Sequence, residues 1–252
     1  MGGDGSTGQL TVVYAPTWEG WGDDPHHSSL AHEGRALVST LLATPGVRVV
    51  YRPHPLTGTR DATIRRAHQD VLALLHAAGA PREAPRAVGP RAGDDIASMF
   101  APATRDQVPS AALEDRAAFW VAHPSTTHRV AEGDWPGLQS VLAEADVLVA
   151  DVSGVVSDWL AQDRPLALAN PAGLDVEEFA RRYPSSRAAL VLGAEGAGLA
   201  EFLTAVRAGQ DPTAQARGAA RAELLGSRDD HDLDRFETAL DALVASPSGS
   251  AG

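Results

Sequence analysis

In the stretch from residue 145 to 171, an apolar run is followed by polar and small residues of types that suit the binding of an anion. Asp151, Ser153 and Gly154 follow the run VLVA, and an amphipathic segment starts at Gly154. A serine hydroxyl can donate to a phosphate oxygen, and a glycine lets the phosphate approach the backbone without a Cβ in the way. Asp158 lies about one helical turn further on, where its carboxylate can accept hydrogen bonds from ribose hydroxyls. Taken alone, these four residues are better explained by a helix cap at Ser153 and a solvated carboxylate at Asp158.

Two further polar groups follow other apolar runs. In YRPHP, Arg52 supplies a permanent positive charge, and His54 can donate to a phosphate oxygen or stabilise charge on a leaving phosphate. In YAPTWEGW, Thr17 is a candidate contact for the phosphorylated ligand, whereas Trp18 and Trp21 are interpreted as core residues. A parallel sheet gathers the carboxyl ends of its strands along one edge, so the combination of these groups favours a binding site.

The elements that must position these residues alternate between apolar and amphipathic segments. This alternation predicts an α/β fold, a doubly wound and mainly parallel sheet with helices on both faces. Strands are expected at 10–15, 47–55, 127–131, 146–151, 165–170 and 188–193. Helices are expected at 27–46, 61–79, 111–122, 135–145, 154–163, 175–183, 198–209, about 212–225 and 233–244.

The predicted domain organisation is simple. Residues 1–9 are expected to form a flexible start, 10–245 a single Rossmann-like domain, and 246–252 a disordered tail. Within the domain, a stretch rich in proline and glycine begins near residue 80, and an irregular insertion is expected at about 80–135.

Composition excludes several kinds of chemistry. The 252 residues carry a formal net charge of −12, which disfavours a nucleic-acid partner, because such a partner needs a basic face. All 21 basic side chains are arginine, so phosphate contacts must come from arginine, histidine, hydroxyls or backbone N–H groups. Cysteine is absent, which removes disulfides and thiol nucleophiles. No apolar run approaches the length of a membrane span.

Neither a metal nor a cofactor is expected. Two groups of potential metal ligands occur, one of them at His123 and His128. The other comprises Asp23, Asp24, His26 and His27. Neither group has convincing ligand spacing, and both are interpreted as solvated loops.

In combination, VVYAPTW, YRPHP and ADVLVADVSGVVSDWL followed by RPLAL resemble the CDP-glycerol glycerophosphotransferase family, the teichoic-acid primases and polymerases. The tail SRDDHDLDRFETAL is similar to the closing helix of that family, and the resemblance covers most of residues 10–245. Two departures concern individual side chains. Gly154 stands where the family's DYSS pattern has a second serine, and Glu19 stands where an arginine is common. The segment 80–135 has no clear counterpart.

The resemblance implies the carboxyl-terminal, donor-binding Rossmann-like half of a GT-B glycosyltransferase. It places His54, Asp151, Ser153, Gly154 and Asp158 at positions associated with the pyrophosphate and nucleotide of the donor. His54 is the predicted catalytic residue, since it can stabilise charge on the leaving phosphate. The implied donor is a CDP-glycerol-type nucleotide. The implied acceptor is a polyol phosphate or a lipid-linked acceptor, bound through a missing amino-terminal domain that also supplies the base. On this reading the isolated chain binds donor without efficient turnover.

Two other readings stay open. One is a sugar-nucleotide enzyme of the same architecture, such as a UDP-N-acetylglucosamine 2-epimerase or another glycosyltransferase. The other is a non-catalytic binding or assembly module with a protein interface at 80–135. The expected location is the cytoplasm. A missing domain could hold the protein at the inner face of the membrane. Homo-oligomer formation is left open.

Overall fold

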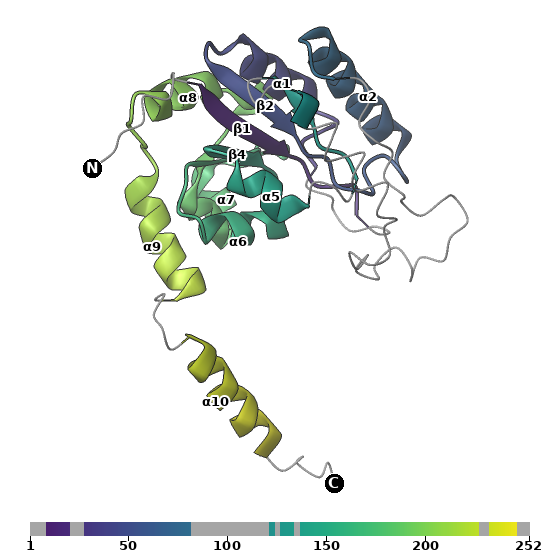
Figure 1. Cartoon of the computed structure of the whole chain (residues 1–252). Coiled ribbons are helices and arrows are strands. Elements are labelled where there is room, and N and C mark those ends of the chain that lie inside the picture. The colour runs from purple at the N-terminus through teal and green to yellow at the C-terminus, as the bar shows by residue number, and fades with distance from the viewer. Residues whose placement is uncertain are drawn as a thin grey trace.

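The computed structural model describes residues 9–20, 28–81, 121–123, 127–133, 137–226 and 232–245, and these contain a parallel sheet of six strands. The strands are β1 (Leu10–Ala15), β2 (Val47–Tyr51), β3 (Arg129–Val130), β4 (Val147–Ala150), β5 (Leu166–Leu168) and β6 (Leu190–Val191). Their order across the sheet is β3-β2-β1-β4-β5-β6. Figure 1 labels the three central strands β2, β1 and β4. Every pairing between them is parallel. This is the strand order of a doubly wound Rossmann-like sheet. The strands are added in one direction from β1 to β3 and in the opposite direction from β4 to β6, so the switch point lies between β1 and β4.

Helices lie between successive strands, and the remaining helices follow the last strand. The α-helices are α1 (Gly34–Ala43), α2 (Ala62–Ala77), α5 (Leu138–Ala143), α6 (Gly154–Leu160), α7 (Val176–Arg182), α8 (Leu199–Arg207), α9 (Ala214–Leu225) and α10 (Asp232–Ala245). Two short 3-10 helices, Pro184–Ala188 and Ala194–Gly196, flank β6. Of the helices in the described ranges, none is both long and apolar enough to cross a membrane.

Both faces of the sheet are covered, and the four strands β2, β1, β4 and β5 are fully buried. Alternate residues of these four strands enter two separate apolar clusters, which is why the strands are mainly apolar in sequence. One cluster packs against α1, α2 and α8, and the other against α5, α6, α7 and α9, as the layers in Figure 1 show. Trp159 is the largest fully buried side chain, and its indole N–H donates to the carbonyls of Arg164 and Pro165. The predicted α/β class is confirmed.

The first strand has the predicted bounds, but the first helix is much shorter than predicted. Residues 28–33 form turns instead, in which the carbonyl oxygen of Ser29 accepts hydrogen bonds from the N–H groups of His32, Glu33 and Gly34. Helix α2 begins close to its predicted start, because Asp61 caps it by accepting from the N–H groups of the first turn.

The range predicted as an insertion is only partly described. Residues 82–120, which include nearly all of the helix predicted at 111–122, lie outside the described residues, and so do the ends 1–8 and 246–252. Strand β3 falls inside the range 80–135 and forms an edge of the sheet. At least this part of the range therefore belongs to the fold itself.

The loop between β2 and α2 contains a glycine that the backbone requires. Gly58 has a φ of +73°, and a Cβ placed there would lie 2.8 Å from the Cα of Arg65. Gly79, at the end of α2, has a φ of +93° but no atom within 4 Å of such a Cβ. We predict that Gly58→Ala lowers the free energy of unfolding by about 2 kcal/mol or more, because backbone strain and a backbone clash add together.

Gly79→Ala is the matched control, since it introduces the strain without the clash. It should cost about 1 kcal/mol in urea denaturation monitored by circular dichroism. Equal losses for the two variants would contradict the close approach of the loop to α2.

Candidate functional site

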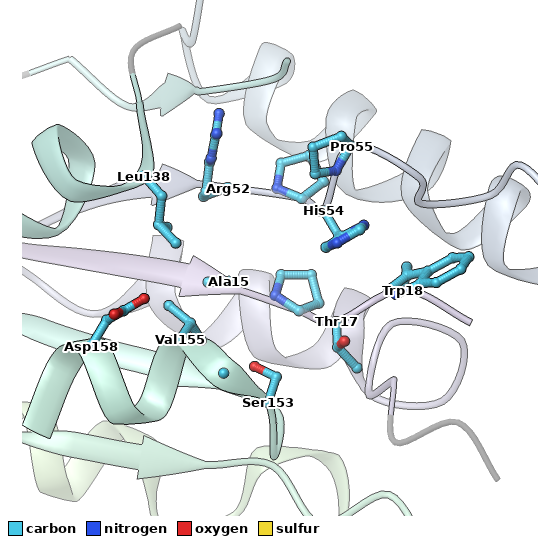
Figure 2. Close-up of a pocket in the computed structure, with 13 residues that line it drawn as sticks. Ala15, Thr17, Trp18, Arg52, His54, Pro55, Leu138, Ser153, Val155 and Asp158 are labelled. Atoms are coloured by element: carbon cyan, nitrogen blue, oxygen red, sulfur yellow. The ribbon is translucent and has the colours of Figure 1, made fainter. Parts of the chain in front are cut away.

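A pocket lies at the carboxyl ends of the strands, at the switch point between β1 and β4. Its volume is about 550 Å³, and it is formed by the loops after β1, β2 and β4 together with the start of α5 (Figure 2). The lining residues are Ala15, Pro16, Thr17, Trp18, Arg52, Pro53, His54, Pro55, Leu138, Ser153, Gly154, Val155 and Asp158. Doubly wound sheets bind their ligands at this place. The pocket brings together six of the seven site residues predicted from the sequence, and Asp151 is the exception.

His54 lines the pocket and is packed against Trp18. The two rings are stacked, with centroids 5.4 Å apart and an interplanar angle of 13°. The Nδ1 atom of His54 accepts a hydrogen bond from the N–H of Leu56 at 3.1 Å, so the neutral imidazole carries its proton on Nε2. Burial lowers the pKa of His54 and the charge of Arg52 lowers it further, while Glu19 acts in the opposite direction. At neutral pH the ring is therefore an uncharged Nε2–H donor.

Trp18 is a pocket residue, so the prediction that it packs in the core is wrong. Its indole is only half-buried and stands beside His54 at one side of the pocket. The sequence missed this pairing because the two residues belong to different strand-end loops. Trp21, the other tryptophan of that segment, lies outside the described residues.

Arg52 holds a neighbouring loop as well as lining the pocket. Its Nη1 donates to the carbonyl oxygens of Ala131 and Gly133, at 2.7 and 2.6 Å. The side chain is buried, and in Figure 2 it extends from the end of β2 toward the loop after β3. Its charge acts on His54, but these two carbonyls fix the position of the guanidinium.

The segment after β4 contributes Ser153, Gly154 and Asp158. Ser153 occupies the N-cap position of α6 with extended backbone, yet its side chain makes no capping hydrogen bond. Its hydroxyl lines the pocket instead. A Cβ placed on Gly154 would meet no atom within 4 Å, so the missing side chain leaves open space in the pocket. Asp158 is exposed on α6, and Thr17 lies across from Ser153 on the loop after β1.

Asp151 does not line the pocket, and its side chain is fully buried. Its Oδ2 accepts hydrogen bonds from the N–H groups of Thr17, at 2.8 Å, and Ser29, at 3.1 Å. Burial raises its pKa to about 7, although the hydrogen bonds from Ser29 and Thr17 lower it, and the nearby carboxylate of Glu33 raises it. In the structure Asp151 therefore connects the end of β4 to the segment after β1.

Glu19 was read from the sequence only as the loss of a cation, but it has a specific place in the structure. Its buried carboxylate accepts hydrogen bonds from the N–H groups of Gly58, Arg60 and Asp61. Burial by itself raises the pKa of Glu19, and the backbone hydrogen bonds outweigh this effect, so the pKa is lowered. The sequence around Glu19, which directly follows Trp18, contains no pattern that predicts these hydrogen bonds.

The histidines considered as metal ligands have other surroundings. The Nδ1 of His128 accepts from the N–H of Val49 at 3.1 Å, so this side chain extends the contact between β2 and β3 and is not a solvated loop residue. Within the described ranges, no three His, Asp or Glu side chains are grouped as metal ligands. Asp23, Asp24, His26 and His27 lie outside those ranges.

The strand order and the pocket define a Rossmann-like α/β protein with a ligand-sized pocket at its switch point. A scan against protein-family models and a search of curated proteins give no match. Among solved structures, the chain is similar to the wall teichoic acid polymerase TagF, at 14% identity and a TM-score of 0.43, over 95% of this chain and 44% of that one.

Two other solved structures are similar to a comparable or lower degree. One is a putative UDP-N-acetylglucosamine 2-epimerase from Listeria monocytogenes, at 10% identity and a TM-score of 0.43, over 95% of this chain and 47% of that one. The other is HAL3 from Cryptococcus neoformans, at 12% identity and a TM-score of 0.34, over 84% of this chain and 99% of that one. The chain spans less than half the length of the polymerase and of the epimerase.

The buried Asp151 predicts a specific pH dependence of stability. Its pKa is higher in the folded protein, about 7, than the value of about 4 for an unfolded aspartate, so folding favours the protonated form. The stabilisation is complete below about pH 4 and is lost as the pH rises through about 7. Asp151→Asn cannot ionise and keeps an oxygen for the N–H groups of Thr17 and Ser29.

We therefore expect the unfolding free energy of the wild type, minus that of Asp151→Asn, to fall by a few kcal/mol between about pH 4 and pH 8. Urea denaturation across this range measures it. A difference that stays constant or increases with pH would show that Asp151 is ionised at no cost in the folded protein.

Proposed function

We propose that this chain is the donor-binding part of a transferase of the CDP-glycerol glycerophosphotransferase type, acting in the synthesis of teichoic-acid-like cell-wall polymers. One observation carries the proposal. The loops after β1, β2 and β4 converge at the switch point and place Thr17, His54, Ser153 and Gly154 around one pocket. Such convergence is the property that a nucleotide-phosphate site requires.

The chemistry of the lining suits a phosphorylated and hydroxylated ligand. The hydroxyls of Thr17 and Ser153 and the Nε2–H of His54 are neutral donors for phosphate oxygens. The open space at Gly154 lets a phosphate approach the backbone. Asp158, at another side of the pocket, can accept from ribose hydroxyls. A volume of about 550 Å³ is within the usual range for small-molecule sites.

In the proposed reaction, an acceptor hydroxyl attacks the phosphorus next to the glycerol or other polyol. A new P–O bond forms, the P–O bond to CMP breaks, and its electron pair goes to the CMP phosphate. His54 donates a hydrogen bond to this leaving phosphate and so stabilises its growing charge. The base that takes the hydroxyl proton, and the site for the acceptor, are assigned to a further, amino-terminal domain. The donor-binding part alone is then expected to bind without efficient turnover.

A sugar-nucleotide enzyme of GT-B architecture is the second candidate. The observation that favours it is Gly154, which stands where the CDP-glycerol pattern has a serine and so removes one hydroxyl from the phosphate site. The two candidates differ in the base of the nucleotide, because the first takes cytidine and the second uridine.

The test is calorimetric titration of the purified chain with CDP-glycerol, CMP, UDP-N-acetylglucosamine and UMP. We expect binding of the cytidine donor, weakened about tenfold each by His54→Ala and Ser153→Ala, because each variant removes one hydrogen bond to a charged phosphate. Preference for the uridine ligands selects the second candidate. Absence of binding by the folded chain, with self-association, favours a non-catalytic assembly module.

Gly154 offers a test that removes no polar group. A Cβ at Gly154 clashes with nothing in the protein, so Gly154→Ala should fold normally while its methyl group occupies space meant for a phosphate. We expect CDP-glycerol to bind at least about tenfold more weakly, the equivalent of losing roughly 1.4 kcal/mol.

Gly218→Ala, on α9 and away from the pocket, is the control, because its Cβ also meets nothing within 4 Å. It should bind the donor as the wild type does. If Gly154→Ala also binds as the wild type does, no phosphate lies against this part of the backbone.

A further inference from the structure

Glu19 joins the loops after β1 and β2, because both oxygens of its carboxylate accept hydrogen bonds from backbone N–H groups. Its Oε2 accepts from the N–H of Gly58 at 2.9 Å, and its Oε1 accepts from those of Arg60 at 2.8 Å and Asp61 at 3.2 Å. The side chain is only 6% exposed. A buried carboxylate with three N–H donors is an ionised anchor, since each hydrogen bond favours the charged form.

The loop that Glu19 holds is also fixed from its other side. The Nε of Arg65 donates to the carbonyl oxygen of Gly58 at 2.7 Å, and the Nη1 of Arg60 donates back to the carbonyl oxygen of Gly20 at 3.1 Å. The contact between the two loops therefore runs in both directions. Their relative position depends on Glu19, because its three bonds connect backbone to side chain across about 40 residues of sequence.

The residues next to this anchor form the aromatic side of the pocket. Trp18 precedes Glu19 directly and stacks on His54, which belongs to the loop that Glu19 holds. His54 is in turn fixed by the hydrogen bond from Leu56 to its Nδ1. A displacement of one loop against the other would separate the two rings. It would also change the position of the Nε2–H donor of His54 relative to Thr17, which lines the same pocket from the loop after β1.

We propose that Glu19 is a positioning residue of the pocket, which keeps Trp18 stacked on His54 by clamping the loop after β2 to the loop after β1. This role rests on the proposed function only in its consequence for nucleotide binding. The clamp itself is a property of the ligand-free protein. Two charged groups act on His54: Arg52 on its own loop and Glu19 on the loop after β1.

The first test is the NMR spectrum of the ligand-free protein. A stacked tryptophan shifts the ring protons of His54 upfield, and Trp18→Leu gives the reference signal without the stack. Glu19→Ala is expected to move the His54 signals most of the way to that reference. Glu19→Gln is expected to restore the wild-type position largely, because its carbonyl oxygen can still accept from Arg60 and Asp61 while only the bond from Gly58 is lost.

A variant elsewhere separates positioning from a general loss of stability. Asp211 is also a carboxylate that holds several donors, Arg217 and Thr213, but it lies outside the pocket lining. Asp211→Ala should lower stability and leave the His54 signals unchanged. His54 signals that stay at the wild-type position in Glu19→Ala, or that move equally in Asp211→Ala, would overturn the proposal.

If Glu19→Ala does not fold, Glu19→Gln decides. Faster hydrogen exchange at the Gly58 amide, together with a partial shift of the His54 signals, supports the clamp, and faster exchange without any shift overturns it. The second test measures binding of CDP, which is expected to weaken at least tenfold in Glu19→Ala and to stay unchanged in Asp211→Ala. If the wild type binds neither CDP nor UDP, the proposed function fails, and the NMR comparison still judges the role of Glu19.

Discussion

Two buried carboxylates hold together the three loops from which the pocket is made. Asp151, at the end of β4, accepts from the N–H groups of Thr17 and Ser29 in the segment after β1, and Glu19 connects that same segment to the loop after β2. Backbone N–H groups in the loops beyond the strands have no partner within the sheet, and burying them unpaired is costly. The two side chains satisfy them, and in doing so they fix the distances across the switch point.

The electrostatics of the pocket follow from this arrangement. The chain has no lysine, and Nη1 of Arg52 donates to the carbonyls of Ala131 and Gly133. The neutral donors that line the pocket are the hydroxyls of Thr17 and Ser153, the imidazole of His54 and backbone N–H groups. Burial and Arg52 keep the pKa of His54 low, whereas an anionic ligand would raise it. Ligand binding would then be coupled to uptake of a proton. Such a site attracts anions less strongly at long range than a lysine-lined one, but it orients them through directional hydrogen bonds.

Sequence patterns predicted the central strands well, because both faces of the sheet are covered and these strands are mainly apolar. The residues of LTVVYA form β1 with no change of bounds, and the end of VLVA at Asp151 marks the end of β4. The first helix was predicted too long, because tertiary contacts hold the residues before the turn. The hydroxyl of Ser28 donates to the carbonyl oxygen of Thr17, and the N–H of Ser29 donates to Asp151. Local periodicity contains no information about such contacts.

The sequence alone determined the α/β class and the polar residues at the strand ends, since apolar periodicity and residue types are local properties. It also placed six of the seven predicted site residues where the sheet brings them to one pocket. Only the tertiary structure decided which of these groups face a ligand and which hold the frame. Asp151 is buried and does not line the pocket, and Trp18 stacks on His54. Glu19 links the loop after β1 to the loop after β2. The physical reason is that burial and hydrogen-bond partners come from residues distant in sequence, and these fix the role of a polar side chain.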